Sequence, residues 1–365
     1  MLQLWLALAT APGLDGQRLS VLLEALGGSG ALAGASDAAL RAAGAGEALI
    51  SHLRQADAAR LDAASAWLAA APDHHLLDWE DPRYPPLLRQ IPDPPVVLFV
   101  HGKPARLSEP QLAMVGSRNA SPGGAATARA FARHLADCGL AITSGLATGI
   151  DAAAHGGALE GRGTTIAVLG TGPDVVYPRQ HAELAAAIAV RGALCSEFLP
   201  GTGPLKHHFP RRNRIISGLA LGTLVVEARL RSGALITAHR AIEQGREVFA
   251  IPGSIHNPLA KGCHRLIREG AKLVESSGHI LEELAPLLGA ITTPAEPVAA
   301  EPQAPDTHDA DYQRLLDALG WDTVDADTLA RRSGLTPAEV SSMLLILELS
   351  GSVQPLAGGR YQRQR

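Results

Sequence analysis

The sequence predicts an α/β protein whose central region is a Rossmann-like, doubly wound and mainly parallel sheet. Short apolar runs of about five to seven residues alternate there with stretches whose apolar residues recur at helical spacing. Such alternation produces right-handed crossovers between parallel strands. The chain has 365 residues, of which 46% are hydrophobic and 19% charged, so a disordered chain is excluded and about two to three domains are expected.

The predicted strands and helices alternate regularly through the central region. The expected strands cover residues 112–116, 140–145, 164–170, 193–198, 223–228 and 247–253. The expected helices between them cover residues 125–137, 151–159, 181–190 and 235–244. Because parallel strands end at the same edge of a sheet, the loops that follow them should converge on one ligand-binding edge.

Composition divides the chain into four regions. Residues 1–72 are rich in Ala and Leu with glycine breaks, which favours a bundle of short helices. Residues 73–288 hold a proline-rich connector, a strand near 96–100 and the central sheet. Prolines among Ala, Glu and Thr predict a semi-rigid linker over 289–308, and residues 309–365 form a last small domain.

Charge, hydropathy and cysteine usage exclude several classes of protein. The net charge is −4, so the whole chain does not resemble a polyanion-binding protein. No apolar run reaches the roughly 18 residues of a membrane span, and no basic residue precedes the apolar start, so we expect a cytoplasmic protein without a membrane partner. The three cysteines have no C-x-x-C spacing, so we expect neither disulfides nor a metal or other cofactor.

The loops after the predicted strands are rich in glycine, serine and arginine. Glycine lets backbone N–H groups approach a ligand, and helix N-termini favour anions. This edge is therefore predicted to bind an anion, although the chain as a whole is acidic. The candidate residues in three of these loops are Gly116, Ser117, Arg118, Ser144, Gly145, Ser232 and Gly233.

The longest predicted loop covers residues 200–213. A strongly basic segment, residues 204–214, begins inside this loop and extends one residue beyond it. Its eleven residues hold four permanent cations, two histidines and one aromatic ring. Cations can follow the phosphates of a single strand while a ring stacks on an unpaired base. The alternative is a solvated basic face with the ring as a core anchor at a helix start. The candidates are Lys206, Phe209, Arg211, Arg212, Asn213 and Arg214.

Other motifs give weaker signals. The sequence Gly170-Thr171-Gly172 follows a strand but lacks the third glycine of a dinucleotide-binding turn, and no P-loop occurs. Asp151 and His155 could suggest a base or metal ligand, although an Asp at a helix start is more often a cap. Glu227 could be an ion-paired residue at a strand end or part of the site.

The motifs, taken in order, resemble the DNA-processing protein DprA/Smf family over about residues 75–280. The residues concerned include Met114-Val115-Gly116-Ser117-Arg118, Ser144 to His155, Tyr177-Pro178, Lys206 to Leu219 and Ser232 to Ala238. The resemblance implies an N-terminal helical domain of the sterile-alpha-motif or helix-hairpin-helix kind and a C-terminal winged helix. Helical patterns at 312–319, 325–332 and 337–350, followed by a possible hairpin at 352–362, agree with the latter.

The resemblance also implies a function. Members of the family bind incoming single-stranded DNA during natural transformation, protect it, dimerise and load the recombinase RecA, helping to displace single-strand-binding protein. By that resemblance, Lys206 and Phe209 hold phosphate and stack a base, and no catalytic residue is expected. The resemblance also includes Arg118, Arg212, Asn213, Arg214, Ser232 and Gly233 in the site. Thr148 and His264 depart from the usual family pattern.

A nucleotide-processing enzyme is the alternative. The phosphoribohydrolases that act on cytokinin nucleotides have a related fold, with a glycine-rich loop and a strand-end glutamate near the phosphate. Glu227 could take that part, but their Pro-Gly-Gly-x-Gly-Thr sequence is absent.

Overall fold

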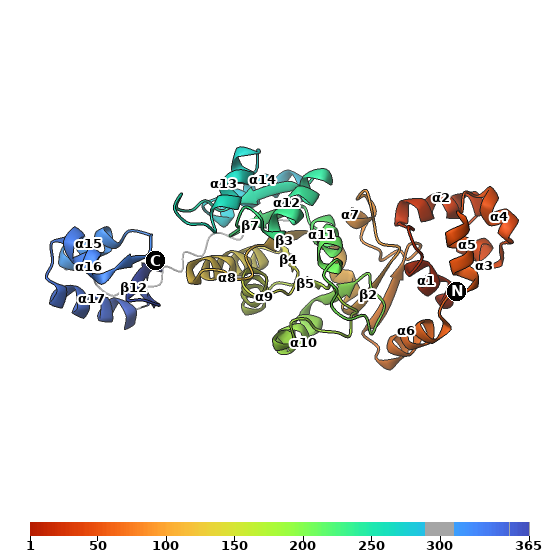
Figure 1. Ribbon diagram of the computed structural model, residues 1–365, viewed down its shortest axis with the longest axis horizontal. Coiled ribbons are helices and arrows are strands. Elements are labelled where there is room, and N and C mark those ends of the chain that lie inside the picture. Colours follow the sequence, from red (N-terminus) through yellow and green to blue (C-terminus); the bar gives the residue numbers. More distant parts are fainter. Residues whose placement is uncertain (289–309, 350, 365) are drawn as a thin grey trace. The chain divides into compact units, whose positions relative to one another are not determined.

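The computed structural model describes residues 1–288, 310–349 and 351–364 (Figure 1). Contacts divide the chain into two units, Met1–Thr293 and Pro294–Arg365. The linker predicted over 289–308 lies outside the described residues. Within those residues, no helix combines the length and the apolar character that crossing a membrane would require.

The described strands of the first unit form one sheet in the order β1-β2-β6-β5-β4-β3-β7-β8-β9 (Figure 1). The seven neighbouring strands from β6 to β9 in this order are all parallel. Strand β2 pairs antiparallel with both β6 and β1. In register, Leu112 of β3 lies between Ile142 of β4 and Gly222 of β7. The bounds are β1 His74–Asp78, β2 Val97–Gly102, β3 Gln111–Val115, β4 Ala141–Ser144, β5 Thr165–Val168, β6 Ala193–Ser196, β7 Gly222–Val225, β8 Glu247–Ala250 and β9 Lys272–Leu273.

Helices cover both faces of this sheet, which confirms the predicted doubly wound fold. Leu112 and Met114 of β3 pack into one core with α8, α9 and α14, whereas Ala113 and Val115 pack into the other with α11, α12 and α13. This alternation follows from the two-residue period of a strand. The helices are α7 Pro86–Arg89, α8 Pro122–Asp137, α9 Ile150–Glu160, α10 Ala182–Arg191, α11 His208–Leu219, α12 Gly233–Glu243, α13 Lys261–Arg268 and α14 Ser277–Leu288, with short 3-10 turns η1 Pro104–Ser108 and η2 Arg179–His181.

The six predicted strands and four predicted helices of the central region are all present, but α11 contradicts the sequence interpretation. The segment 200–213 was expected to be a loop, yet the chain is helical from His208 onward. The apolar periodicity of α11 is hidden because Arg212 and Arg214 occupy buried positions on it. Strands β1 and β9 and helices α13 and α14 were not predicted either.

The N-terminal residues form six helices that share a hydrophobic core with the sheet domain. Trp5, Leu19 and Leu49 belong to the same cluster as Val97 and Phe99 of β2. Short side-chain caps start several of these helices, as where Asp15 accepts a hydrogen bond from the Arg18 amide at 2.8 Å. The bounds are α1 Leu2–Ala9, α2 Gly16–Leu26, α3 Ser29–Gly34, α4 Asp37–Ala42, α5 Glu47–Arg54 and α6 Ala58–Ala70.

The second unit has the helices and hairpin of a winged helix. Leu315, Leu329 and Leu344 form its core with Val353 of the wing. Strand order is β10-β12-β11, with Val324 opposite Tyr361 and Gln354 opposite Gln362. The bounds are α15 Ala310–Leu319, β10 Val324–Asp325, α16 Ala326–Ser333, α17 Pro337–Leu349, β11 Val353–Leu356 and β12 Arg360–Arg363.

Candidate nucleic-acid interface

The candidate interface lies where the strand order of the sheet reverses. After β3 the chain builds β4, β5 and β6 on one side, then returns to place β7 on the other side of β3. Loops after β3 and β7 therefore leave in opposite directions, and a crevice forms beyond the strand ends at such a point. The loop containing Arg118 follows β3, Ser144 is the last residue of β4, and the loop after β4 begins at Gly145.

Two buried carboxylates of the protein occupy the helix N-termini at this edge. The Glu227 carboxylate accepts hydrogen bonds from the Ser121 amide at 2.9 Å and the Ser121 hydroxyl at 2.6 Å, at the start of α8. A Cβ at Gly124 would lie 2.3 Å from this carboxyl carbon, so a side chain at position 124 would displace the Glu227 carboxylate. Glu227 was expected to be ion-paired or part of the site, but it forms no ion pair with the described residues; instead its carboxylate binds Ser121 at the start of α8, with its charge matched to that helix N-terminus.

Asp151 lies in the first turn of α9, where its charge matches the helix N-terminus, but it is not the cap that the sequence predicted, because the N-cap is Gly149. Its carboxylate accepts hydrogen bonds from the amides of Gly145 at 3.2 Å and Ala147 at 3.3 Å, both in the preceding loop, and so holds that loop in place. Burial raises the pKa of Asp151, and the nearby Arg212 guanidinium opposes that shift. The two helix ends that a nucleotide phosphate would normally occupy are thus already matched by the chain's own carboxylates.

The loop after β3 passes close to α9 and presents Arg118 to solvent. Gly149 has a φ of +78°, and a Cβ there would lie 2.2 Å from the Ser117 carbonyl oxygen. The Ile150 amide donates to the same oxygen at 3.1 Å. This close approach fixes Gly116 and Ser117, both partly buried, and leaves the Arg118 side chain exposed.

An aromatic pair lies beside Arg118. The ring centroids of Phe209 and Tyr177 are 5.6 Å apart with a 47° tilt, and the Arg118 guanidinium carbon is 5.6 Å from the Phe209 centroid. Phe209 is partly buried and Tyr177 is 47% exposed. A Cβ at Gly170 would lie 2.8 Å from the Phe209 ring, so Gly170 makes room for this ring rather than for a dinucleotide.

Lys206 and Arg211 are the two exposed cations of the basic segment, residues 204–214. Lys206 forms no ion pair with any residue that the structure describes. Arg211 is paired with the Glu197 carboxylate at 2.9 Å and lies over the Phe198 ring, with its guanidinium carbon 5.8 Å from the centroid. The charge of Arg211 is therefore partly committed inside the protein, whereas that of Lys206 is not.

Arg212 and Arg214 were expected among the cations that face a ligand, but both side chains are buried. Arg212 donates to the carbonyl oxygens of Gly145, at 2.9 Å, and Val168. Burial lowers its pKa to about 10, with the Asp151 charge opposing and the Arg118 charge contributing. Arg212 thus remains charged at neutral pH and, together with Arg118, adds positive potential beneath this edge.

Arg214 belongs to a buried ion pair. It donates to the two Glu197 carboxylate oxygens at 3.0 and 2.8 Å and to Asp93 at 2.9 Å. The side chains of Arg214 and Glu197 are only 6% and 3% exposed, so their charges are neutralised by each other and by the second partners Asp93 and Arg211. This pair fixes α11 to the end of β6 and to the connector before β2.

Of the remaining predicted site residues, some are buried and others are partly or fully exposed. Ser144 is buried, and its hydroxyl donates to the Met114 carbonyl oxygen at 2.6 Å. Ser232 caps α12 by accepting from the Ala234 amide at 3.3 Å, with Gly233 exposed as the first residue of that helix. Asn213 is partly buried on α11. Gly145 is buried, and a Cβ there would lie within 2.7 Å of both the Arg212 guanidinium and the Asp151 carboxylate.

His155 has no catalytic surroundings. It is fully buried, its Nδ1 lies 2.7 Å from the Thr165 hydroxyl, and its Nε2 has no hydrogen-bond partner in the described structure. Burial lowers its pKa to about 3, so the ring is neutral under ordinary conditions.

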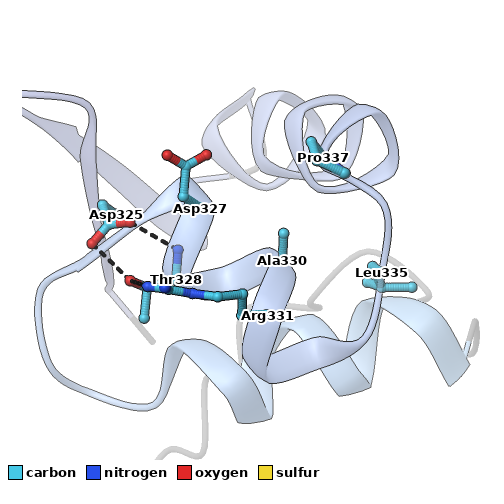
Figure 2. A pocket seen from close by; sticks show the side chains of 7 residues that line it. All are labelled: Asp325, Asp327, Thr328, Ala330, Arg331, Leu335 and Pro337. Carbon is cyan, nitrogen blue, oxygen red and sulfur yellow. Dashed lines mark hydrogen bonds between the residues drawn. The ribbon is translucent and has the colours of Figure 1, made fainter.

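The winged-helix unit has a shallow pocket of its own near the N-terminus of α16 (Figure 2). Asp325 accepts hydrogen bonds from the amide and hydroxyl of Thr328 at 2.8 and 2.9 Å, which hold the pKa of its carboxyl below the usual value. Asp327 lies on the same pocket. Its lining holds two carboxylates and one cation, Arg331, so the pocket has no excess of positive charge for a phosphate.

Sequence reasoning singled out Tyr177 only as part of a motif and missed its place in the interface. Residues 177 and 209 are separated by 32 positions, and the loop that contains Tyr177 shows no periodicity that would orient the ring. The one signal in the sequence that could have indicated this role for Tyr177 was an aromatic residue next to a proline in the loop after a strand.

Comparison with known proteins identifies the family. Residues 75–285 match the model of DNA recombination-mediator protein A, and residues 299–359 match that of the DprA winged helix domain. The chain is 46% identical to protein Smf of Escherichia coli over 308 residues, 84% of this chain and 81% of that protein.

Two solved structures are also similar. The X-ray structure of DNA processing protein A from Streptococcus pneumoniae aligns with a TM-score of 0.65 and 41% identity, over 75% of this chain and 95% of that one. A structure of DNA processing protein A from Helicobacter pylori, reported with its single-stranded DNA binding mode, aligns with a TM-score of 0.53 and 26% identity, over 58% and 96%. The chain therefore belongs to the DNA recombination-mediator protein A family, as the sequence motifs indicated.

Proposed function

We propose that this chain binds single-stranded DNA at the edge formed by Arg118, Lys206, Phe209 and Tyr177. The observation that carries the proposal is that the exposed Arg118 lies against a partly exposed aromatic pair, while the exposed Lys206 precedes Phe209 by three residues. Neither cation forms an ion pair with the residues that the structure describes. Cations follow the phosphates of a flexible strand, and a ring stacks on any unpaired base, so the binding is tolerant of sequence. The Helicobacter pylori relative, which binds single-stranded DNA, supports this function.

The buried cations contribute indirectly. Arg212 and Arg214 position the loops and α11, and Arg212 adds positive potential beneath the edge. The same arrangement favours DNA binding over nucleotide hydrolysis. The strand-end glutamate that a phosphoribohydrolase-like enzyme would use, Glu227, is committed to capping α8. Incubation with nucleoside monophosphates should release no free base.

Salt-dependent binding of a fluorescent oligo(dT) tests the interface. Each phosphate contact removed from a single strand reduces the slope of log affinity against log salt by about 0.7. We expect Arg118→Ala and Lys206→Ala each to weaken binding and to flatten the slope by about this amount. Arg133→Ala removes an exposed cation of α8 that forms no ion pair with the described residues, and should change neither. Unchanged slopes in both edge variants would refute this interface.

We further propose, from family membership, that the chain acts as a dimer which protects single-stranded DNA and loads RecA onto it. Two edges on one strand raise the effective concentration of each for the DNA. The proposal predicts faster RecA-dependent ATP hydrolysis on DNA covered by single-strand-binding protein, and slower nuclease digestion of the strand. Sedimentation at increasing protein concentration tests the dimer. A chain that binds DNA but does not accelerate RecA would retain the first proposal and refute this one.

A further inference from the structure

Two histidines face each other across the first two strands of the sheet, of which β1 is the edge strand. His74 of β1 pairs with His101 of β2 in the antiparallel ladder. The Gly102 amide donates to the Asp73 carbonyl oxygen at 2.9 Å, so the neighbouring residues form the hydrogen-bonded pair and the histidines form the non-hydrogen-bonded one. Side chains approach most closely at such pairs, and these ring centroids are 4.9 Å apart.

The orientation of His74 leaves one ring nitrogen available as a ligand. Its Nδ1 lies 2.7 Å from the Trp67 carbonyl oxygen at the end of α6. A carbonyl oxygen only accepts, so Nδ1 holds the proton and Nε2 keeps its lone pair. Stacking on the Trp67 ring at 4.0 Å holds the imidazole in place. Metal-binding histidines show this same pattern, in which the second nitrogen donates to a carbonyl or carboxylate.

Asp73 completes the cluster. One of its carboxylate oxygens lies 3.4 Å from the His101 Nε2. Tetrahedral zinc with bonds of about 2.1 Å separates its ligand atoms by about 3.4 Å. One ligand atom from each of Asp73, His74 and His101 lies within 4.8 Å of the others. The half-exposed Asp73 side chain can rotate to close the wider separations.

We propose that Asp73, His74 and His101 bind a divalent transition-metal ion such as Zn²⁺. Two imidazoles and one carboxylate suit such ions better than Mg²⁺ or Ca²⁺, which prefer oxygen ligands alone. Side-chain exposures of 50% for Asp73 and 31% for His101 allow the ion to enter and water to complete the coordination. The ion joins the start of β1 to the end of β2 beside α6, and so ties the N-terminal helices to the sheet.

Calorimetric titration of the full chain tests the site, after treatment with a chelator and its removal. We expect one Zn²⁺ per chain, and with Co²⁺ a saturable visible absorption of a low-symmetry site at the same stoichiometry. His74→Gln, His101→Gln and Asp73→Asn should each weaken Zn²⁺ binding by about tenfold or more. His75→Gln is the matched control, because His75 is adjacent in β1 and lies on the opposite face of the strand.

Thermal unfolding provides a second measurement. Zn²⁺ should raise the melting temperature of the wild-type chain and of His75→Gln, and have little effect on His101→Gln or Asp73→Asn. Equal affinity in wild type and Asp73→Asn, or equal loss in His75→Gln, would show only adventitious binding to surface histidines and would overturn the proposal. Absence of a saturable Co²⁺ signal in the wild type overturns it without any variant.

Discussion

The basic segment over residues 204–214 has an exposed part and a buried part that use the same residue types for different purposes. Lys206 precedes α11 and faces solvent, whereas Arg212 and Arg214 lie on the buried side of that helix. The buried cations are matched by carbonyl oxygens and by Glu197, whereas the exposed Lys206 has no ion pair among the described residues. The number of cations in a segment therefore does not measure the charge it presents to a ligand.

The largest expected effect comes from the buried part. Arg214→Ala leaves the Glu197 carboxylate buried with one partner lost, so the free energy of unfolding should fall by about 3–5 kcal/mol. Denaturant titration measures the change. Arg229→Ala, an exposed arginine without an ion pair among the described residues, should stay within about 0.5 kcal/mol of wild type. Equal stability of Arg214→Ala and wild type would show that this pair is not essential to the fold.

The second prediction concerns His155, a fully buried histidine of α9. Its native-state pKa of about 3 is below the unfolded value of about 6.5, so the unfolded state takes up a proton first as the pH falls. Stability from this group is complete above pH 6.5 and declines between about pH 6.5 and 3. Between about pH 7.5 and 5, wild type should lose about 2 kcal/mol more than His155→Gln. Parallel stability curves for the two would contradict the burial of a neutral imidazole.

The third prediction tests whether the exposed part of the basic segment binds DNA by base stacking on Phe209. Phe209→Leu keeps an apolar side chain against Gly170 but removes the stacking surface, so affinity for single-stranded DNA should fall by about 1–3 kcal/mol. Fluorescence anisotropy with oligo(dT) measures it. Phe131→Leu is the matched control, because Phe131 is likewise a partly buried ring on a helix, α8, and it should leave affinity unchanged. If duplex DNA lost as much affinity as the single strand, base stacking would not explain the effect.

The smallest predicted effect separates the two exposed cations of the basic segment. Arg211 is already paired with Glu197, so Arg211→Ala should flatten the salt slope by much less than the value of about 0.7 expected for Lys206→Ala. The same binding curves measure both. An equal change in the two variants would mean that the Arg211–Glu197 pair opens when DNA binds.

Sequence reasoning found the parallel strands because both faces of the sheet are covered. Burial on both faces makes residues such as 112–115 apolar without interruption, and the helices between strands keep their own period. Reasoning failed for α11, because two of its buried positions hold arginines whose partners, Gly145 and Glu197, are distant in sequence. It also missed β1, where His74 and His75 interrupt the apolar pattern.

The sequence by itself determined the fold class, the family and the residue types available at the edge, since these depend on local periodicity and on ordered motifs. Only the tertiary structure decided which cations are exposed, that Tyr177 joins Phe209, and that Glu227 and Asp151 fill the helix ends. It also brought Asp73 and His74 to His101. These outcomes depend on strand order and side-chain packing between distant segments, which no spacing along the chain encodes.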